Sequence, residues 1–229
     1  MGDFTGFGPT TLGFLRELEA NNNRDWFQAN KARYDACVLE PSLDFIVAVG
    51  DHLPAISKHL VAIPKRMGGS LMRVYRDTRF SKDKTPYKTN IGIQFRHEQA
   101  KDVHAPGLYF HLDNNECFLG VGMWHPDRDA LAAIRGAIAE NGGRWKRVRD
   151  DKAFRAVYDL SGASLKRPPQ GFPGDHRYVE DLKRKDFIGI KRMLPESAAS
   201  PAFAEDVAAM FAAGRGFMRF LCRSLELPF

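Results

Sequence analysis

Cysteine is scarce in this sequence, and no long apolar run interrupts it. Cys37, Cys117 and Cys222 are odd in number and far apart, and no CxxC pair occurs. This pattern excludes a disulfide framework and the usual structural zinc site, and it favours buried thiols in a reducing compartment. No apolar run approaches the roughly 20 residues that cross a bilayer, and the first residues lack the blocks of a signal peptide. We therefore expect a cytoplasmic protein with no membrane contact.

The common motifs of catalysis and recognition are also missing. The sequence contains no GxxxxGK[ST] phosphate loop, no GxSxG nucleophile elbow and no HExxH metal motif. His97, His104 and His111 are seven residues apart, but only His111 falls within an expected strand. We therefore expect no metal and no cofactor. Helix-turn-helix, zinc-finger, KH and RRM signatures are absent as well.

Helical periodicity occupies both ends of the chain. Residues 10–20 predict a helix, and Asn23 is placed to cap the next one, which should run from Trp26 to before Pro54 with a kink at Pro41. Further helices are predicted from the cap Asp127 to the glycines at 142–143, over 150–159, and from about 202 to 225. Residues 160–176 are rich in Pro and Gly, which is typical of a loop.

The middle of the chain changes to a period of two. Apolar and polar residues alternate over 71–77, 91–96, 108–112 and 117–124, and the sequence DNNE at 113–116 is typical of a hairpin turn. Four such runs in succession predict an antiparallel meander of about four or more strands with one apolar face. With helices before and after it, this sheet defines a single α+β domain over residues 1–229.

Positive charge is concentrated in two segments of the chain. The whole sequence has a net charge of +6, whereas residues 73–90 hold six basic and two acidic residues, and residues 144–192 hold fourteen and seven. Such local excess suggests a field for anions, although a solvated, lysine-rich surface is the commoner meaning of a charge run.

The second face of the predicted sheet carries an unusual set of residues. It collects a mixture of aromatic, charged and other polar residues, with Gly120 and Gly122 among them: Arg73, Tyr75, Asp77, Gln94, Arg96, Tyr109, His111, Phe118 and Trp124. Glycine within a strand often marks the close approach of a ligand or another backbone. The basic loop 77–90 adds Arg79, whose planar fork suits phosphate or carboxylate, and the flexible cations Lys82, Lys84 and Lys88. A solvent-facing or helix-covered sheet would explain the same residues without any ligand.

Four ordered segments resemble one known family. Residues 21–35 (NNNRDWFQANKARYD), 73–90 (RVYRDTRFSKDKTPYKTN), 107–112 (GLYFHL) and 120–135 (GVGMWHPDRDALAAIR) are similar to signature segments of the domain of unknown function 2461 family, and 165–172 and 175–187 fit its C-terminal pattern. The resemblance implies a single-domain protein of a widespread bacterial and fungal group. It brings no established activity and no catalytic residues.

Three hypotheses about function follow from these residues. The first is a pocket for a phosphate-bearing or other anionic small molecule on the polar sheet face and the 77–90 loop. Arg73 and Arg79 would neutralise the anion, and Tyr75 and Trp124 would contact its flat part. Asp77 or His111 would orient it or supply acid–base chemistry in a hydrolase or transferase. The second is a nucleic-acid-binding module that uses segments 73–90 and 144–192. The third is a scaffold without a small-molecule site.

Overall fold

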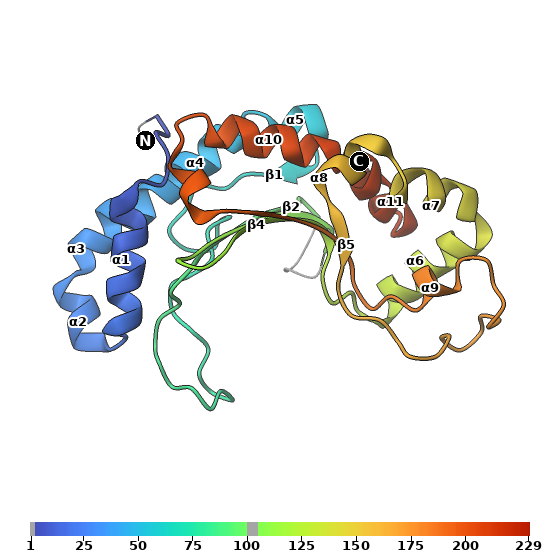
Figure 1. The fold of residues 1–229 in the computed structure, drawn as a ribbon, viewed down its shortest axis with the longest axis horizontal. Coiled ribbons are helices and arrows are strands. Elements are labelled where there is room, and N and C mark those ends of the chain that lie inside the picture. Colours follow the sequence, from blue (N-terminus) through green and yellow to red (C-terminus); the bar gives the residue numbers. More distant parts are fainter. Residues whose placement is uncertain (1–2, 100–104) are drawn as a thin grey trace.

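The structure is a computed structural model that describes residues 3–99 and 105–229, so His104 lies outside the described residues. Its helices and strands follow one another as Figure 1 labels them. The helices are α1 (Pro9–Ala20), α2 (Arg24–Ala29), α3 (Lys31–Tyr34), a π-helical turn (Asp35–Leu39), α4 (Glu40–Gly50), α5 (Leu53–Ile56), α6 (Arg128–Glu140), α7 (Gly142–Arg149), α8 (Lys152–Val157), α9 (Val179–Leu182), a 3-10 turn (Pro195–Ala199), α10 (Phe203–Ala213) and α11 (Arg215–Ser224). The strands are β1 (Leu60–Val61), β2 (Ile91–His97), β3 (Gly107–Leu112), β4 (Cys117–Met123), β5 (Asp159–Ser161) and β6 (Phe187–Met193).

Within the described residues the six strands form one antiparallel sheet in the order β1-β2-β3-β4-β6-β5. Alternation places the apolar residues of the three predicted central strands on one face, where Ile93, Phe110 and Leu119 pair across neighbouring strands and are fully buried. The turn at 113–116 joins β3 to β4, and its Asp113 N–H donates to the Glu116 carbonyl. The predicted α+β fold with a central antiparallel sheet is confirmed.

Helices α4, α10 and α11 cover the apolar face of the sheet (Figure 1). The rings of Phe45 on α4 and Phe203 on α10 lie 4.8 and 5.7 Å from the ring of Phe110 on β3. The opposite face, called here the open face, lies between α1–α3 with the 73–90 segment on one side and α6, α9 and the 162–178 segment on the other (Figure 1). Sheet and flanking elements together form an arch (Figure 1).

The long helix predicted from Trp26 is divided. Asn23 caps α2 as predicted, since its side chain accepts from the Trp26 N–H at 2.9 Å. The chain then passes through α3 and the π-helical turn before α4 begins at Glu40, with Pro41 in its first turn. Pro41 has no N–H to donate to the preceding turn, so the regular helical ladder cannot continue through this position. The helical backbone is nonetheless continuous from Lys31 to Gly50, so the predicted long helix is interrupted at Asn30 and is irregular, not broken, next to Pro41.

Two strand predictions also need correction. Residues 71–77 form no regular strand; only the isolated bridges Leu71↔Ile93 and Tyr75↔Tyr87 occur there. Strand β6 was missed, because the sequence around 183–193 was interpreted as a possible exposed helix face.

The C-terminal helix is divided as well. It breaks into α10 and α11 at Gly214, where a Cβ atom would lie 3.1 Å from the Val121 side chain. Among the described residues, no helix is long and apolar enough to cross a membrane.

Candidate ligand-binding site

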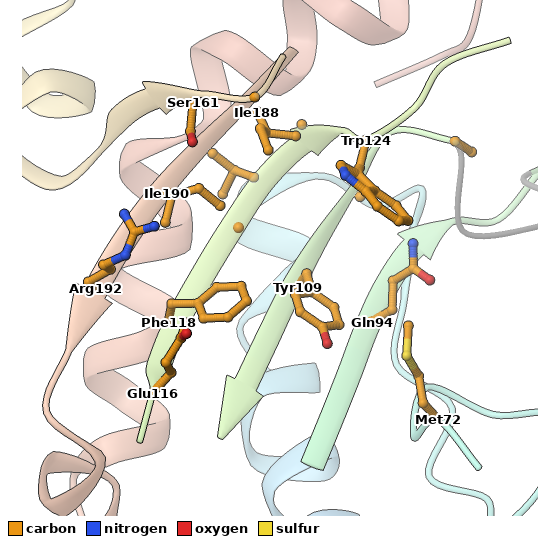
Figure 2. Close-up of a pocket in the computed structure, with 16 residues that line it drawn as sticks. Met72, Gln94, Tyr109, Glu116, Phe118, Trp124, Ser161, Ile188, Ile190 and Arg192 are labelled. Carbon is orange, nitrogen blue, oxygen red and sulfur yellow. The ribbon is translucent and has the colours of Figure 1, made fainter. Parts of the chain in front are cut away.

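A cavity of about 500 Å³ lies on the open face of the sheet. Strands β2, β3, β4 and β6 supply its floor, and Met72, Trp124 and Ser161 come from the segments around them. Figure 2 shows Tyr109 and Phe118 projecting side by side from β3 and β4, with Trp124 at one end and Arg192 and Glu116 at the other. We call this space the sheet cavity.

Strand register explains which residues meet in the sheet cavity. One row across the sheet pairs Gln94 with Tyr109, Tyr109 with Gly120, and Gly120 with Ile190. The next row along the strands pairs Gly92 with His111, His111 with Phe118, and Phe118 with Arg192. Because directly opposed residues point to the same face, residues distant in sequence are brought together at one surface.

Glycines make the floor hollow. Gly120 sits between Tyr109 and Ile190, so the row dips where its side chain is missing. Gly122 lies on the row on the other side of Gly120, where it pairs with Gly107 and Ile188. It has a φ of +123°, and a Cβ atom there would lie 2.1 Å from the Phe187 carbonyl oxygen. This position therefore requires glycine, since the conformation and the close approach of β6 both exclude a side chain.

The walls of the sheet cavity are mainly apolar and aromatic. The rings of Tyr109 and Phe118 lie 5.8 Å apart at 49°, and Trp124 leaves 52% of its surface exposed. Ile188 and Ile190 complete the wall on β6. A concave, largely apolar surface with a few polar groups at its ends is typical of small-molecule sites.

The polar groups lie at the ends of the cavity. Arg192 is exposed and, within residues 3–99 and 105–229, its guanidinium takes part in no ion pair or hydrogen bond. Its guanidinium is always charged and offers several donors in one plane, which suits a carboxylate or phosphate. Glu116 lines the same end, and Gln94 lies on β2 across the sheet. Anion binding at Arg192 would thus occur beside an aromatic surface.

A chain of three polar side chains leads from the cavity towards the hairpin turn. The Tyr109 hydroxyl lies 3.3 Å from Nδ1 of His111, and Nε2 of His111 lies 3.0 Å from Asp113 Oδ2. With Asp113 accepting from Nε2–H, Nδ1 of the neutral ring can accept from the Tyr109 hydroxyl. The His111 ring also stacks on Phe118, with centroids 4.6 Å apart and planes inclined by 11°.

The pKa values of Tyr109 and Asp113 are shifted by burial and by local charges and hydrogen bonds. Burial, with a smaller contribution from the Asp113 charge, raises the pKa of Tyr109 to about 12. Burial alone would raise the pKa of Asp113. Hydrogen bonds from His111 and from the backbone N–H groups of Asn115 and Glu116 outweigh it, so the pKa is lowered. Tyr109 is therefore a neutral phenol and Asp113 a carboxylate at neutral pH.

Asp186 braces the segments at the Trp124 end of the cavity. This carboxylate is 2% exposed and accepts from the backbone N–H groups of His125 and Ala163, each at 2.8 Å. His125 has a φ of +48°, an uncommon conformation for a residue other than glycine. The two segments that follow β4 and β5 are thereby fixed to one buried group.

The structure separates the predicted site residues into two places. Tyr109 and Trp124 line the sheet cavity, and His111 is one contact away through Tyr109. The remaining predicted residues belong to the segment that projects from the sheet beside α1–α3 and are not among those that line the cavity (Figure 1). They are Arg73, Tyr75, Asp77, Arg79, Lys82, Lys84 and Lys88.

Charges within the 77–90 loop largely satisfy one another. Arg79 donates to Asp77 from Nε at 3.0 Å and from an amino group at 2.7 Å, and this pairing lowers the pKa of Asp77. Arg76 pairs with Asp83, and Nζ of Lys84 donates to the Thr78 carbonyl at 2.8 Å. The loop thus holds its shape through its own polar groups.

The two ends of the same segment contact the folded body. The Tyr75 ring lies 5.4 Å from that of Tyr87, which stacks on Phe27 at 4.0 Å. Lys88 is partly buried, and its pKa is lowered mainly by this burial and to a smaller extent by the nearby charge of Arg73.

Sequence reasoning missed part of the site. Phe118 and Gln94 fall on the predicted polar face but were not selected as binding residues, and Met72 was assigned to the apolar side of a strand. The β6 residues Ile188, Ile190 and Arg192 were missed with their strand. The alternation of the β-branched Ile188 and Ile190 with Gly189 and Lys191 is the short pattern that could have revealed this strand.

Fold and cavity together define an α+β protein with a ligand-sized hollow on the uncovered face of an antiparallel sheet. The family model described as "Conserved hypothetical protein (DUF2461)" matches residues 10–220, so the chain belongs to this family and the predicted resemblance is confirmed. All residues that line the sheet cavity lie within the matched range. Comparisons with curated proteins and with solved structures found no match.

Proposed function

We propose that this protein binds a small molecule with a flat apolar part and an anionic group, such as a carboxylate or phosphate, in the sheet cavity. The observation that carries the proposal is the position of Arg192, a cation without a partner in the described residues, beside the aromatic wall of a 500 Å³ hollow. A cavity of this size matches the range of small-molecule sites, about 300–1,000 Å³.

Each end of the ligand has a chemical reason to bind. Its flat part would pack against Tyr109, Phe118 and Trp124, whose burial on binding contributes the apolar share of the affinity. Its anionic group would accept two N–H donors from Arg192, a geometry that fixes orientation as well as charge. The anion is thus assigned to Arg192 and not to Arg79, which already pairs with Asp77. A contribution from the 77–90 loop stays a prediction.

The enzyme version of the proposal is a hydrolase or transferase acting on this ligand. The Tyr109 hydroxyl would then serve as a proton donor in the cavity, and the His111–Asp113 pair would accept a hydrogen bond from it or return a proton to it. The raised pKa of Tyr109 keeps the hydroxyl protonated at neutral pH, as a general acid requires. Asp77, the other predicted catalytic candidate, lies in the projecting loop.

A thermal-shift screen with two variants tests the proposal. The panel holds aromatic carboxylates, nucleotides, sugar phosphates and short single-stranded DNA and RNA. A ligand at a hundred times its dissociation constant adds about 2.7 kcal/mol to the free energy of unfolding, or roughly 5–11 °C in Tm for a chain of this size. Arg192→Gln should abolish the shift caused by anionic ligands, and Gly120→Val should abolish it by filling the cavity floor.

The matched control is Lys191→Gln, which makes the same charge change one residue earlier, on the strand's other side. A shift that survives in both Arg192→Gln and Gly120→Val would refute the sheet cavity as the site. Shifts caused only by oligonucleotides, and weakened by salt, would favour the nucleic-acid hypothesis. No shift across the panel would favour the scaffold. In Figure 1 the basic segments 73–90 and 144–192 lie mainly towards opposite ends of the sheet.

A further inference from the structure

A second cavity, of about 310 Å³, lies between α7 and α11, away from the residues of the sheet cavity. Its rim consists of four arginines, two from each helix: Arg144, Arg147, Arg219 and Arg223. Its floor is formed by Val148, Gly216 and Phe220. We call it the arginine groove.

Helical spacing and one aromatic anchor bring these arginines together. Arg219 and Arg223 are four residues apart on α11, and Arg144 and Arg147 are three apart on α7, so each pair lies on one side of its helix. The buried Trp145 of α7 packs against Phe217 and Phe220 of α11, with ring centroids 5.9 and 5.2 Å apart. The helices are thereby held with their arginines facing a common space.

The charge of the arginine groove is not balanced by the protein. None of its four arginines forms an ion pair with a carboxylate in the part of the chain that the structure describes. The guanidinium of Arg219 lies over the ring of Phe229, 5.7 Å from its centroid. Arg149, on the same helix α7 but outside the groove, is different, because it forms ion pairs with both Asp150 and Asp181. Like charges at this spacing destabilise a helix, so a groove that collects four of them without a counter-charge is suited to an external anion.

We propose that the arginine groove binds a compact anion made of two or three linked phosphate groups, either free or attached to a nucleoside. Guanidinium groups match phosphate oxygens in bidentate geometry, and four of them balance the three to four negative charges that such a group carries.

Two observations favour a compact ligand over a long nucleic-acid strand. The groove is small, and acidic residues flank α7 in the sequence, with Glu140 before it and Asp150 and Asp151 after it, while Glu226 follows α11. A nucleic-acid strand needs a positive surface that continues along its backbone, and these carboxylates interrupt the run of basic residues in the sequence. The floor presents Val148 and the buried Phe220, so recognition rests on the phosphates and not on a base.

Isothermal titration of the full chain with sodium tripolyphosphate, pyrophosphate, ATP, GTP and a single-stranded oligonucleotide tests this proposal. The decisive variant is Arg219→Gln/Arg223→Gln. The control is Arg128→Gln/Arg167→Gln, which removes the same charge from residues that line neither cavity. We expect the groove variant to raise the Kd for tripolyphosphate at least about tenfold, because it loses charged hydrogen bonds to the phosphate oxygens. The control variant should change this Kd by no more than about twofold, because it alters only the net charge of the protein and not the groove.

The arms of the titration separate the possible outcomes. Equal affinity for tripolyphosphate and for ATP or GTP would assign the groove to linked phosphate in general. Higher affinity for ATP or GTP than for tripolyphosphate would assign it to a nucleotide. The absence of tripolyphosphate binding, or equal weakening by both double variants, would overturn the proposal. Binding of the oligonucleotide alone, lost in the groove variant, would overturn it in favour of a nucleic-acid surface. Loss of tripolyphosphate binding in Arg192→Gln but not in the groove variant would overturn the proposal and assign the anion to the sheet cavity instead.

Discussion

Replacing Gly122 by alanine tests how closely β4 and β6 approach under the sheet cavity. The added Cβ atom would lie 2.1 Å from the Phe187 carbonyl oxygen and 2.9 Å from a ring carbon of Phe217, so β6 or α11 must move to admit it. The φ of +123° adds backbone strain of about 1–3 kcal/mol for any residue other than glycine. We expect a total loss of about 3 kcal/mol or more in the free energy of unfolding, which lowers Tm by roughly 6–12 °C.

The matched control is Gly120→Ala, two residues earlier on the same strand. Its Cβ atom would lie 3.6 Å from both Ile190 and Tyr109, which is ordinary van der Waals contact. We expect a change of less than about 1 kcal/mol, with a stabilising contribution from the smaller entropy of the unfolded chain. Urea unfolding of both variants provides the comparison. If the two differ by less than about 1 kcal/mol, the inferred close approach of β6 to Gly122 is wrong.

Three further predictions concern single groups. Burial raises the pKa of Cys117 and of Cys222 to about 12, whereas Cys37 is partly exposed. A thiol reagent should therefore label Cys37 in the native protein and the other two only in denaturant, as mass spectrometry of the labelled peptides can check. The pKa of Asp113 is lower in the folded state than in the unfolded state, where it is about 3.9, so this carboxylate stabilises the fold above pH 3.9 and ceases to do so as pH falls through its folded-state pKa. Asp113→Asn should therefore make the free energy of unfolding fall less steeply between about pH 5 and 3. Urea unfolding at pH 7, 4 and 3 should show this, and parallel curves for variant and wild type would contradict it. Asp186→Ala leaves two backbone N–H groups without an acceptor and should lower the free energy of unfolding by about 2–4 kcal/mol, measured in the same way; an unchanged midpoint would refute the bracing role.

Local patterns predicted the centre of the fold well. Strands β2, β3 and β4 alternate cleanly because one face packs on helices, and the caps Asn23 and Asp127 act through their own side chains within three residues. The run 71–77 alternates too, yet only Leu71 bridges to β2, on the edge of β2 that β1 also uses. Alternation shows that a segment is able to form a strand. Whether it forms one also depends on whether another strand lies beside it to accept its hydrogen bonds.

The sheet cavity could be predicted only in part. Tyr109 and Trp124 were found because their strand periodicity places them on one face. Arg192 enters through the pairing of β6 with β4, a long-range register that no local pattern contains. The charges of the 77–90 loop are plain in the sequence, but the pairing of Asp77 with Arg79 depends on the loop conformation.

The lengths of the outer strands have a consequence for how the protein behaves in a crowded solution. Among the described residues, β1 has two residues and β5 has three, and these form the two sides of the sheet. A short edge exposes few unpaired N–H and C=O groups, so another chain finds little to extend by strand addition. The sheet can therefore keep one broad face uncovered without presenting the long, flat edges from which β-aggregation begins.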